Sequence, residues 1–167
     1  GARPKDLGGS TAKVVIDPNN SKNKALQITT INGDTTSIIG SLEGNMNCKS
    51  AVFEAKVMVD SNSKGGSLFN IKIGDGTNHM YQWVISGGGN SFSIYTRQDT
   101  KNSGKVVIAD GLETDSWYDI KIEYIPDGKV NTSIKFYIDG DFVRETNKYY
   151  GEADGINDPN INLAVYT

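Results

Sequence analysis

The chain contains only one cysteine, Cys48, and one histidine, His79. A lone cysteine excludes an internal disulfide, and one cysteine with one distant histidine cannot make a zinc ligand set. Basic and acidic residues number 17 and 20, give a net charge of −3 and form no block of either sign, which argues against a nucleic-acid partner. No apolar run approaches the roughly 18–20 residues of a membrane span, so no membrane partner is expected.

Glycine, by contrast, is abundant: there are 19 glycines and 4 prolines, while 37% of the residues are hydrophobic. A length of 167 residues fits one domain. We expect residues 1–12 to be an N-terminal tail or tag remnant and residues 13–167 to form a single β-sandwich domain. Because Gly1 stands where a gene product has methionine, we expect the sequence to be a piece of a larger protein, with this domain tethered to others.

Apolar and polar residues alternate with a period of two in one segment after another, and no segment keeps helical spacing. The expected strands are 25–31, 51–60, 67–75, 80–86, 92–98, 105–109, 117–125, 132–139, 141–146 and 161–166. Turn-forming sequences such as Gly87-Gly88-Gly89 and Asp139-Gly140 separate them. Many short strands at this spacing predict an all-β fold, a two-sheet antiparallel β-sandwich.

The alternation also assigns the two faces of each strand, because a half-buried strand segregates its residues by parity. The predicted inward residues are Phe69, Ile71, Ile73, Phe92, Ile94, Thr96, Tyr118, Ile120, Ile122, Tyr124, Ile134, Phe136 and Ile138. The predicted outward residues are polar or aromatic, and they include Tyr95, Arg97, Asp119, Lys121, Glu123, Lys135 and Tyr137. We expect these outward residues to offer one solvated sheet face.

Two consecutive strands carry a pattern that points to a known family. A tryptophan opens a strand with apolar residues at alternate positions, and the next strand ends in Tyr-x-Asp-Gly. The matching residues are Trp117, Ile120, Ile122, Tyr124, Tyr137, Asp139 and Gly140. In this pattern the chain resembles the concanavalin A-like lectin/glucanase superfamily, in particular its laminin-G-like jelly rolls. The resemblance implies a jelly-roll sandwich with a concave sheet face that often binds sugars, as in bacterial carbohydrate-binding modules and adhesins.

The superfamily also contains glucanases, whose carboxylates come from a Glu-x-Asp-x-x-Glu string on one strand. No such string occurs here, and the nearest approach, Glu113, Asp115 and Asp119, begins in a turn and lacks the final glutamate. Lyases with related sandwiches rely on tyrosine, histidine and arginine or lysine to abstract a proton beside a uronate carboxylate. The residues available for it are His79, Tyr81, Tyr95 and Arg97. We expect no catalytic residues, and a glycan lyase or hydrolase remains the first alternative.

Sugars bind to aromatic rings that stack on the pyranose, and to amides and cations that hydrogen-bond to hydroxyls. The candidate carbohydrate-binding residues are Tyr81, Gln82, Trp83, Tyr95, Arg97 and Tyr137. Trp83 is ambiguous, because parity groups it with Tyr81 and Ile85 in the core while its size also suits a stacking platform.

Many sandwiches of this kind carry a structural calcium, held by carboxylates, amides and backbone carbonyls. The candidate metal ligands are Asp154, Asn157 and Asp158, in the loop before the last strand. The segment Asp17-Pro18-Asn19-Asn20 offers a second loop of this kind.

The sequence therefore predicts a non-catalytic carbohydrate-binding module of a larger secreted bacterial protein, located outside the cell or on its surface. Its partner would be a polysaccharide or oligosaccharide that lies across the concave sheet face. The second alternative, after an enzyme, is an adhesion or structural surface module that binds protein.

Overall fold

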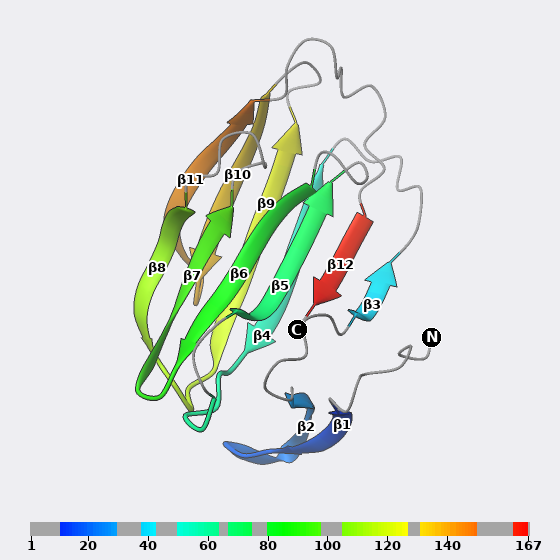
Figure 1. Cartoon of the computed structure of the whole chain (residues 1–167), viewed down its shortest axis with the longest axis vertical. Coiled ribbons are helices and arrows are strands. Elements are labelled where there is room, and N and C mark those ends of the chain that lie inside the picture. Colours follow the sequence, from blue (N-terminus) through cyan, green and yellow to red (C-terminus); the bar gives the residue numbers. More distant parts are fainter. Residues whose placement is uncertain are drawn as a thin grey trace.

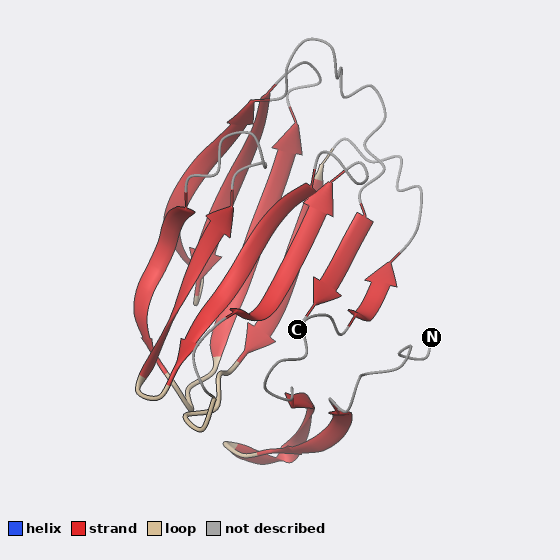
Figure 2. Cartoon of the chain, in the orientation of Figure 1, coloured by secondary structure: helices blue, strands red, loops and turns tan. Residues whose placement is uncertain are grey.

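The computed structural model describes residues 11–29, 38–42, 50–63, 67–74, 80–97, 105–126, 131–149 and 162–166 (Figure 1). Every regular element in these ranges is a strand, as Figure 2 shows by colour. Within the same ranges no helix is long and apolar enough to cross a membrane. The predicted all-β class is confirmed.

Twelve strands occupy the described ranges. They are β1 (Thr11–Asp17), β2 (Asn20–Thr29), β3 (Ile38–Leu42), β4 (Ala51–Val57), β5 (Ser67–Gly74), β6 (Met80–Gly88), β7 (Ser91–Arg97), β8 (Lys105–Glu113), β9 (Tyr118–Pro126), β10 (Asn131–Ile138), β11 (Asp141–Tyr149) and β12 (Asn162–Tyr166). Ten of them correspond to expected strands, and β1 and β3 are additional.

The strands form two facing sheets and a separate ribbon. A four-stranded sheet has the order β11-β10-β9-β4, and a six-stranded sheet has the order β3-β12-β5-β6-β7-β8. The six-stranded sheet lies in front of the four-stranded one in Figure 1. All the described strand pairs are antiparallel. This is the predicted antiparallel β-sandwich.

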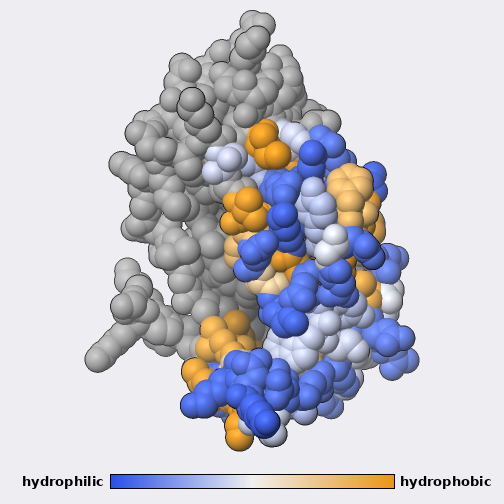
Figure 3. All heavy atoms as spheres, turned by 180° about the vertical axis from the view of Figure 1, so that it is seen from behind, coloured by the Kyte–Doolittle hydropathy of each residue, from blue (hydrophilic) through white to orange (hydrophobic). Residues whose placement is uncertain are grey.

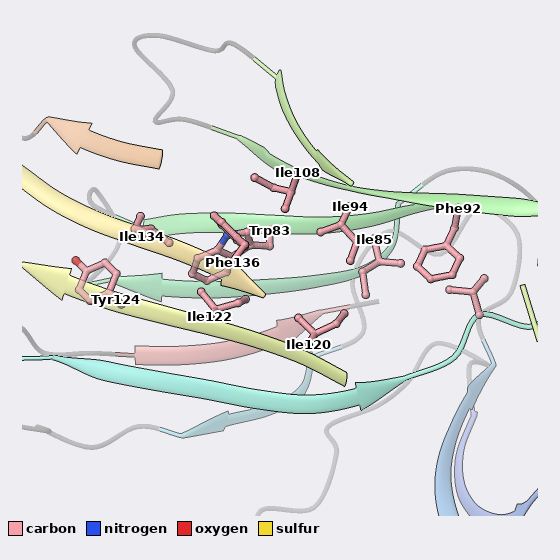
Figure 4. Packing of buried hydrophobic residues seen from close by; sticks show 11 residues of the cluster. Trp83, Ile85, Phe92, Ile94, Ile108, Ile120, Ile122, Tyr124, Ile134 and Phe136 are labelled. Atoms are coloured by element: carbon pink, nitrogen blue, oxygen red, sulfur yellow. The ribbon is translucent and has the colours of Figure 1, made fainter. Parts of the chain in front are cut away.

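The hydrophobic core fills the space between the two sheets (Figure 4). Trp83 of β6 packs edge-on against Phe136 of β10, with ring centroids 5.6 Å apart. Ile122 and Ile134 of the four-stranded sheet are buried to 1% and 0% relative exposure. Each such side chain removed from water contributes about 1.5–3 kcal/mol, so this layer is what holds the sheets together.

Parity correctly predicts which side chains enter this layer. The predicted inward residues that the structure describes as buried are Phe92, Ile94, Thr96, Ile120, Ile122, Tyr124, Ile134 and Phe136, while Tyr118 and Ile138 are half-buried against them. The side chains of Phe69, Ile71 and Ile73 lie outside the described residues.

The ribbon formed by β1 and β2 is tied to one end of the sandwich through Asp17. The Asp17 carboxylate accepts hydrogen bonds from the Asn19 backbone N–H (2.8 Å), the Trp117 Nε1 (2.9 Å) and the Asn23 Nδ2 (3.1 Å). Led by the Asn19 bond, these donors hold the pKa of Asp17 below its ordinary value. Asn19 Nδ2 also donates to the Asp115 carbonyl, at 3.2 Å. Trp117 therefore anchors the ribbon as well as opening the pattern around β9.

Candidate functional site

The candidate sugar-binding residues lie on different faces of the sandwich, so the expectation of one solvated face is wrong. Five of the candidates belong to β6 and β7 of the six-stranded sheet, whereas Tyr137 belongs to β10 of the four-stranded sheet. A sandwich of two sheets has two outer faces, and parity along a strand cannot say to which of them an outward residue belongs.

Trp83 is a core residue, so the prediction that it binds sugar is wrong. Its exposed fraction is 1%, and it packs against Phe136 of the opposite sheet. Its place follows from the register, because Trp83 lies directly opposite Thr96, which is also fully buried. The sequence left two places open for Trp83, the core and an exposed stacking platform, and the structure places it in the core.

Tyr95 faces outward, as predicted, but it is not an open platform. Its exposed fraction is 6%, and its neighbour across the strand pair, Val84, is completely buried. Both residues lie on the face of the six-stranded sheet that points away from the core, because Trp83 and Ile94 beside them in sequence point into it. The middle of this face is therefore covered, and Tyr95 cannot stack on a sugar without rearrangement.

A row of polar residues crosses the same sheet next to Tyr95. Gln82 lies opposite Lys72 of β5 and opposite Arg97 of β7, and Arg97 lies opposite Lys105 of β8. These pairings come from the strand register, and the side chains of the four residues lie outside the described ones. Neighbouring strands are ~4.8 Å apart, so the row is about 14 Å long. The register thus aligns two of the predicted site residues, Gln82 and Arg97, with two lysines.

Of the residues considered for lyase chemistry, the structure describes the side chain of Tyr95 alone. Tyr81 belongs to β6 and Arg97 to β7, where Arg97 lies opposite Gln82. Tyr95 is covered, and His79 lies outside the described residues.

The carboxylates considered for hydrolysis have structural partners. Asp115 adopts a positive φ of 60° in the turn before β9, and its Oδ1 accepts a hydrogen bond from the Ser61 N–H at 2.9 Å. These contacts with Ser61 lower the pKa of Asp115, the opposite of what a general acid requires. Asp119 pairs with Lys56 at 3.3 Å.

Tyr137 lies on the outer face of the four-stranded sheet, where it is half-buried rather than open. Its hydroxyl donates to Glu123 Oε2 at 3.1 Å, and the Lys121 ammonium lies 5.0 Å from its ring centroid. Lys121 and Glu123 pair at 2.7 Å. This hydrogen-bonded pair raises the pKa of Lys121 and lowers that of Glu123, so both stay charged around the ring.

The open aromatic ring on this face is one that the sequence analysis missed. Phe142 of β11 lies opposite Tyr137, is 57% exposed, and its ring centroid is 5.7 Å from that of Tyr137 at an interplanar angle of 68°. The signal was present in the sequence, because Asp139-Gly140 is a two-residue hairpin turn that sets the residues on either side against each other.

The expected calcium ligands, Asp154, Asn157 and Asp158, lie outside the described residues. In the part of the chain that the structure describes, no three His, Cys, Asp or Glu side chains come close enough to hold a metal ion. The second candidate loop does not suit a cation, because the Asp17 carboxylate already accepts three N–H donors.

No protein-family model matches the chain, and no curated protein matches it. Solved structures do share its fold. A carbohydrate esterase of the Shiga toxin-encoding bacteriophage phi24B has a TM-score of 0.68 at 12% identity, over 95% of this chain and 79% of that one. An endo-beta-1,4-glucuronan lyase from the fungus Trichoderma reesei has a TM-score of 0.59 at 11% identity, over 98% of this chain and 78% of that one. The chain therefore shares its β-sandwich fold with proteins described as carbohydrate-active.

Proposed function

We propose that this chain is a non-catalytic carbohydrate-binding module of the concanavalin A-like type, part of a larger secreted bacterial protein. Its ligand is a polysaccharide lying along the row of Lys72, Gln82, Arg97 and Lys105 in the six-stranded sheet. The fold shared with a carbohydrate esterase and a glucuronan lyase supports a carbohydrate ligand. A chain of this kind acts outside the cell or on its surface, tethered to other domains of its parent protein.

The observation that carries the proposal is the row Lys72, Gln82, Arg97 and Lys105. If alternation holds along these strands, as it does for Trp83 and Ile94, the three cations and the amide share one face. We expect them to provide hydrogen-bond donors, and one acceptor, along about 14 Å of sheet. Such a line suits an extended chain of sugar units better than a compact ligand. Cations donate to both hydroxyl and carboxylate oxygens, so acidic polysaccharides belong among the ligands to be tested.

The module rather than the enzyme is proposed because the described members of the two candidate catalytic sets are covered or engaged in other contacts. Tyr95 is covered, and Asp115 and Asp119 have structural partners. A non-catalytic module needs only a line of contacts on a rigid sheet, which the row supplies.

The test is affinity electrophoresis of the whole chain in gels that contain neutral or acidic polysaccharides, followed by calorimetry with the retained ones. Arg97→Ala removes a charged hydrogen-bonding group, whose loss costs ~1.5–3 kcal/mol, so the dissociation constant should rise about 10–100-fold. Lys22→Ala, at an exposed position of the ribbon, is the matched control and should bind normally.

The same samples separate the alternatives. Release of reducing ends or of unsaturated products during incubation would overturn the non-catalytic proposal in favour of an enzyme. Migration unchanged in every polysaccharide would overturn carbohydrate binding and favour a protein-binding adhesion module.

We also propose a structural calcium ion held by Asp154, Asn157 and Asp158. Two carboxylates and an amide carbonyl are hard oxygen donors of the kind that calcium prefers.

A further inference from the structure

The outer face of the four-stranded sheet carries a fixed and open aromatic ring. Phe142 is the second residue after the turn at Asp139 and Gly140, whose φ values of 53° and 88° are both positive. The Tyr137 ring packs edge to face against the Phe142 ring. Tyr137 is itself fixed by its hydrogen bond to Glu123 and by the Lys121 ammonium over its ring. The ring of Phe142 is thus oriented by its neighbours and yet 57% of the residue is exposed.

A shallow hollow of about 610 Å³ lies on the same sheet, over β4, β9 and the turn. The polar groups that line it are Glu54, Lys56, Asp119, Lys121 and Asp139, with Gly140 at the turn. Its volume is within the range of about 300–1,000 Å³ typical of small-ligand sites. Lys121 belongs both to the hollow and to the Tyr137 ring, so the hollow and the aromatic pair adjoin.

The charges of the hollow alternate in sign. Lys56 pairs with Asp119 at 3.3 Å and both side chains are more than half exposed, while Glu54 lies opposite Lys121 in the strand register. With three carboxylates and two ammonium groups, such a surface provides donors and acceptors side by side and has an excess of one negative charge. That combination matches the hydroxyl groups of a neutral sugar, each of which both donates and accepts. It does not favour a carboxylated sugar.

The surrounding surface argues against a protein partner here. Among the described residues seen from behind in Figure 3, hydrophilic ones predominate and hydrophobic ones occur as separate groups. Protein-binding patches have a continuous apolar centre that is depleted in charge. A single ring beside polar groups is instead the arrangement that receives a pyranose, whose apolar face stacks while its edge is hydrogen-bonded.

We propose that Phe142 and the adjoining hollow form a second carbohydrate-binding site, which takes a short run of neutral pyranose units. Phe142, Tyr137, Lys121 and Glu54 follow one another across four strands, about 14 Å in all, so one unit stacks on Phe142 while the hydroxyls of the following units bond to Lys121, Glu54 and Lys56. This inference rests on the proposed carbohydrate-binding function, but it concerns the opposite face of the sandwich from Arg97. Two sites on opposite faces would let one module bridge two polysaccharide chains.

The test uses neutral hexasaccharides of β-1,4-linked glucose, xylose and mannose, titrated into the ¹⁵N-labelled whole chain. Saturable shifts of the Phe142, Lys121 and Gly140 amides are expected with at least one of them. Phe142→Ala should weaken that binding about tenfold, since it removes the apolar area that the sugar covers. Phe142→Trp should restore it. Val52→Ala, which removes a 59% exposed side chain of β4 outside the hollow, should change nothing.

The outcomes separate this site from the first one. If Phe142→Ala binds every hexasaccharide as tightly as the wild type, the second site is refuted, whatever Arg97→Ala does. If Arg97→Ala alone abolishes all binding, the first site stands and the second falls. If Phe142→Ala alone abolishes it, the second site stands and the row is not the binding surface. Equal loss in Phe142→Ala and Val52→Ala would also refute the stacking role.

Discussion

Replacing Trp83 by alanine should destabilise the fold severely without a separate effect on sugar binding. Trp83 is 1% exposed and packs on Phe136 at 5.6 Å, so the substitution leaves a cavity between the sheets. Truncating a buried tryptophan costs about 3–5 kcal/mol, of which the aromatic contact supplies about 0.5–1.5 kcal/mol. A domain of this size loses about 2–4 °C in melting temperature per kcal/mol, so the expected drop is about 6–20 °C.

The assays are thermal and urea unfolding followed by circular dichroism, with Phe142→Ala as the exposed aromatic control. Substitutions at the surface usually stay within about 0.5 kcal/mol of the wild type, so the control should unfold almost normally. Two results would refute the reasoning: an unchanged midpoint for Trp83→Ala, or a fully stable Trp83→Ala variant that has lost polysaccharide binding. The second result would make Trp83 the stacking platform after all.

Three further predictions concern the framework. Gly87→Ala should cost about 1–3 kcal/mol in urea unfolding, because at its φ of +136° a Cβ would lie 2.7 Å from Phe92 Cα; an unaltered midpoint would contradict this. The pKa of Asp17 is lowered in the fold, so its carboxylate stabilises the fold above its unfolded pKa of about 3.9, and this stabilisation disappears as the pH falls through the folded value. Asp17→Asn should therefore flatten the acid side of a plot of unfolding free energy against pH. An identical plot would contradict the role of its three donors. Adding a calcium chelator should lower the melting temperature if Asp154, Asn157 and Asp158 hold an ion, and an unchanged melt removes that proposal.

The strands and their inward faces could be predicted because alternation is a local property. In β9, Ile120, Ile122 and Tyr124 alternate with charged residues, and all three are buried as parity requires. β1 escaped prediction because its apolar residues, such as Val14 and Ile16, remain 68% and 64% exposed in a ribbon outside the sandwich. Because that segment is not buried against a sheet, it lacks the alternation of apolar and polar residues that marks the strands of the sandwich.

The site was harder to predict, because it depends on which strands become neighbours. Gln82 and Arg97 were both expected at the site, but only the register shows that Lys72 and Lys105 extend them into a row. Tyr95 follows the outward parity and is nevertheless covered. Parity describes one strand at a time, whereas exposure depends on everything that lies over the sheet.

The proposal that this chain binds polysaccharide along the six-stranded sheet is tested most directly by one comparison. Calorimetry of the wild type, Arg97→Ala and Lys22→Ala against the polysaccharide retained most strongly in affinity gels measures the contribution of the row. The account predicts that Arg97→Ala weakens binding about 10–100-fold while Lys22→Ala binds like the wild type. Equal affinities for all three proteins, or no binding by the wild type to any polysaccharide, would contradict it.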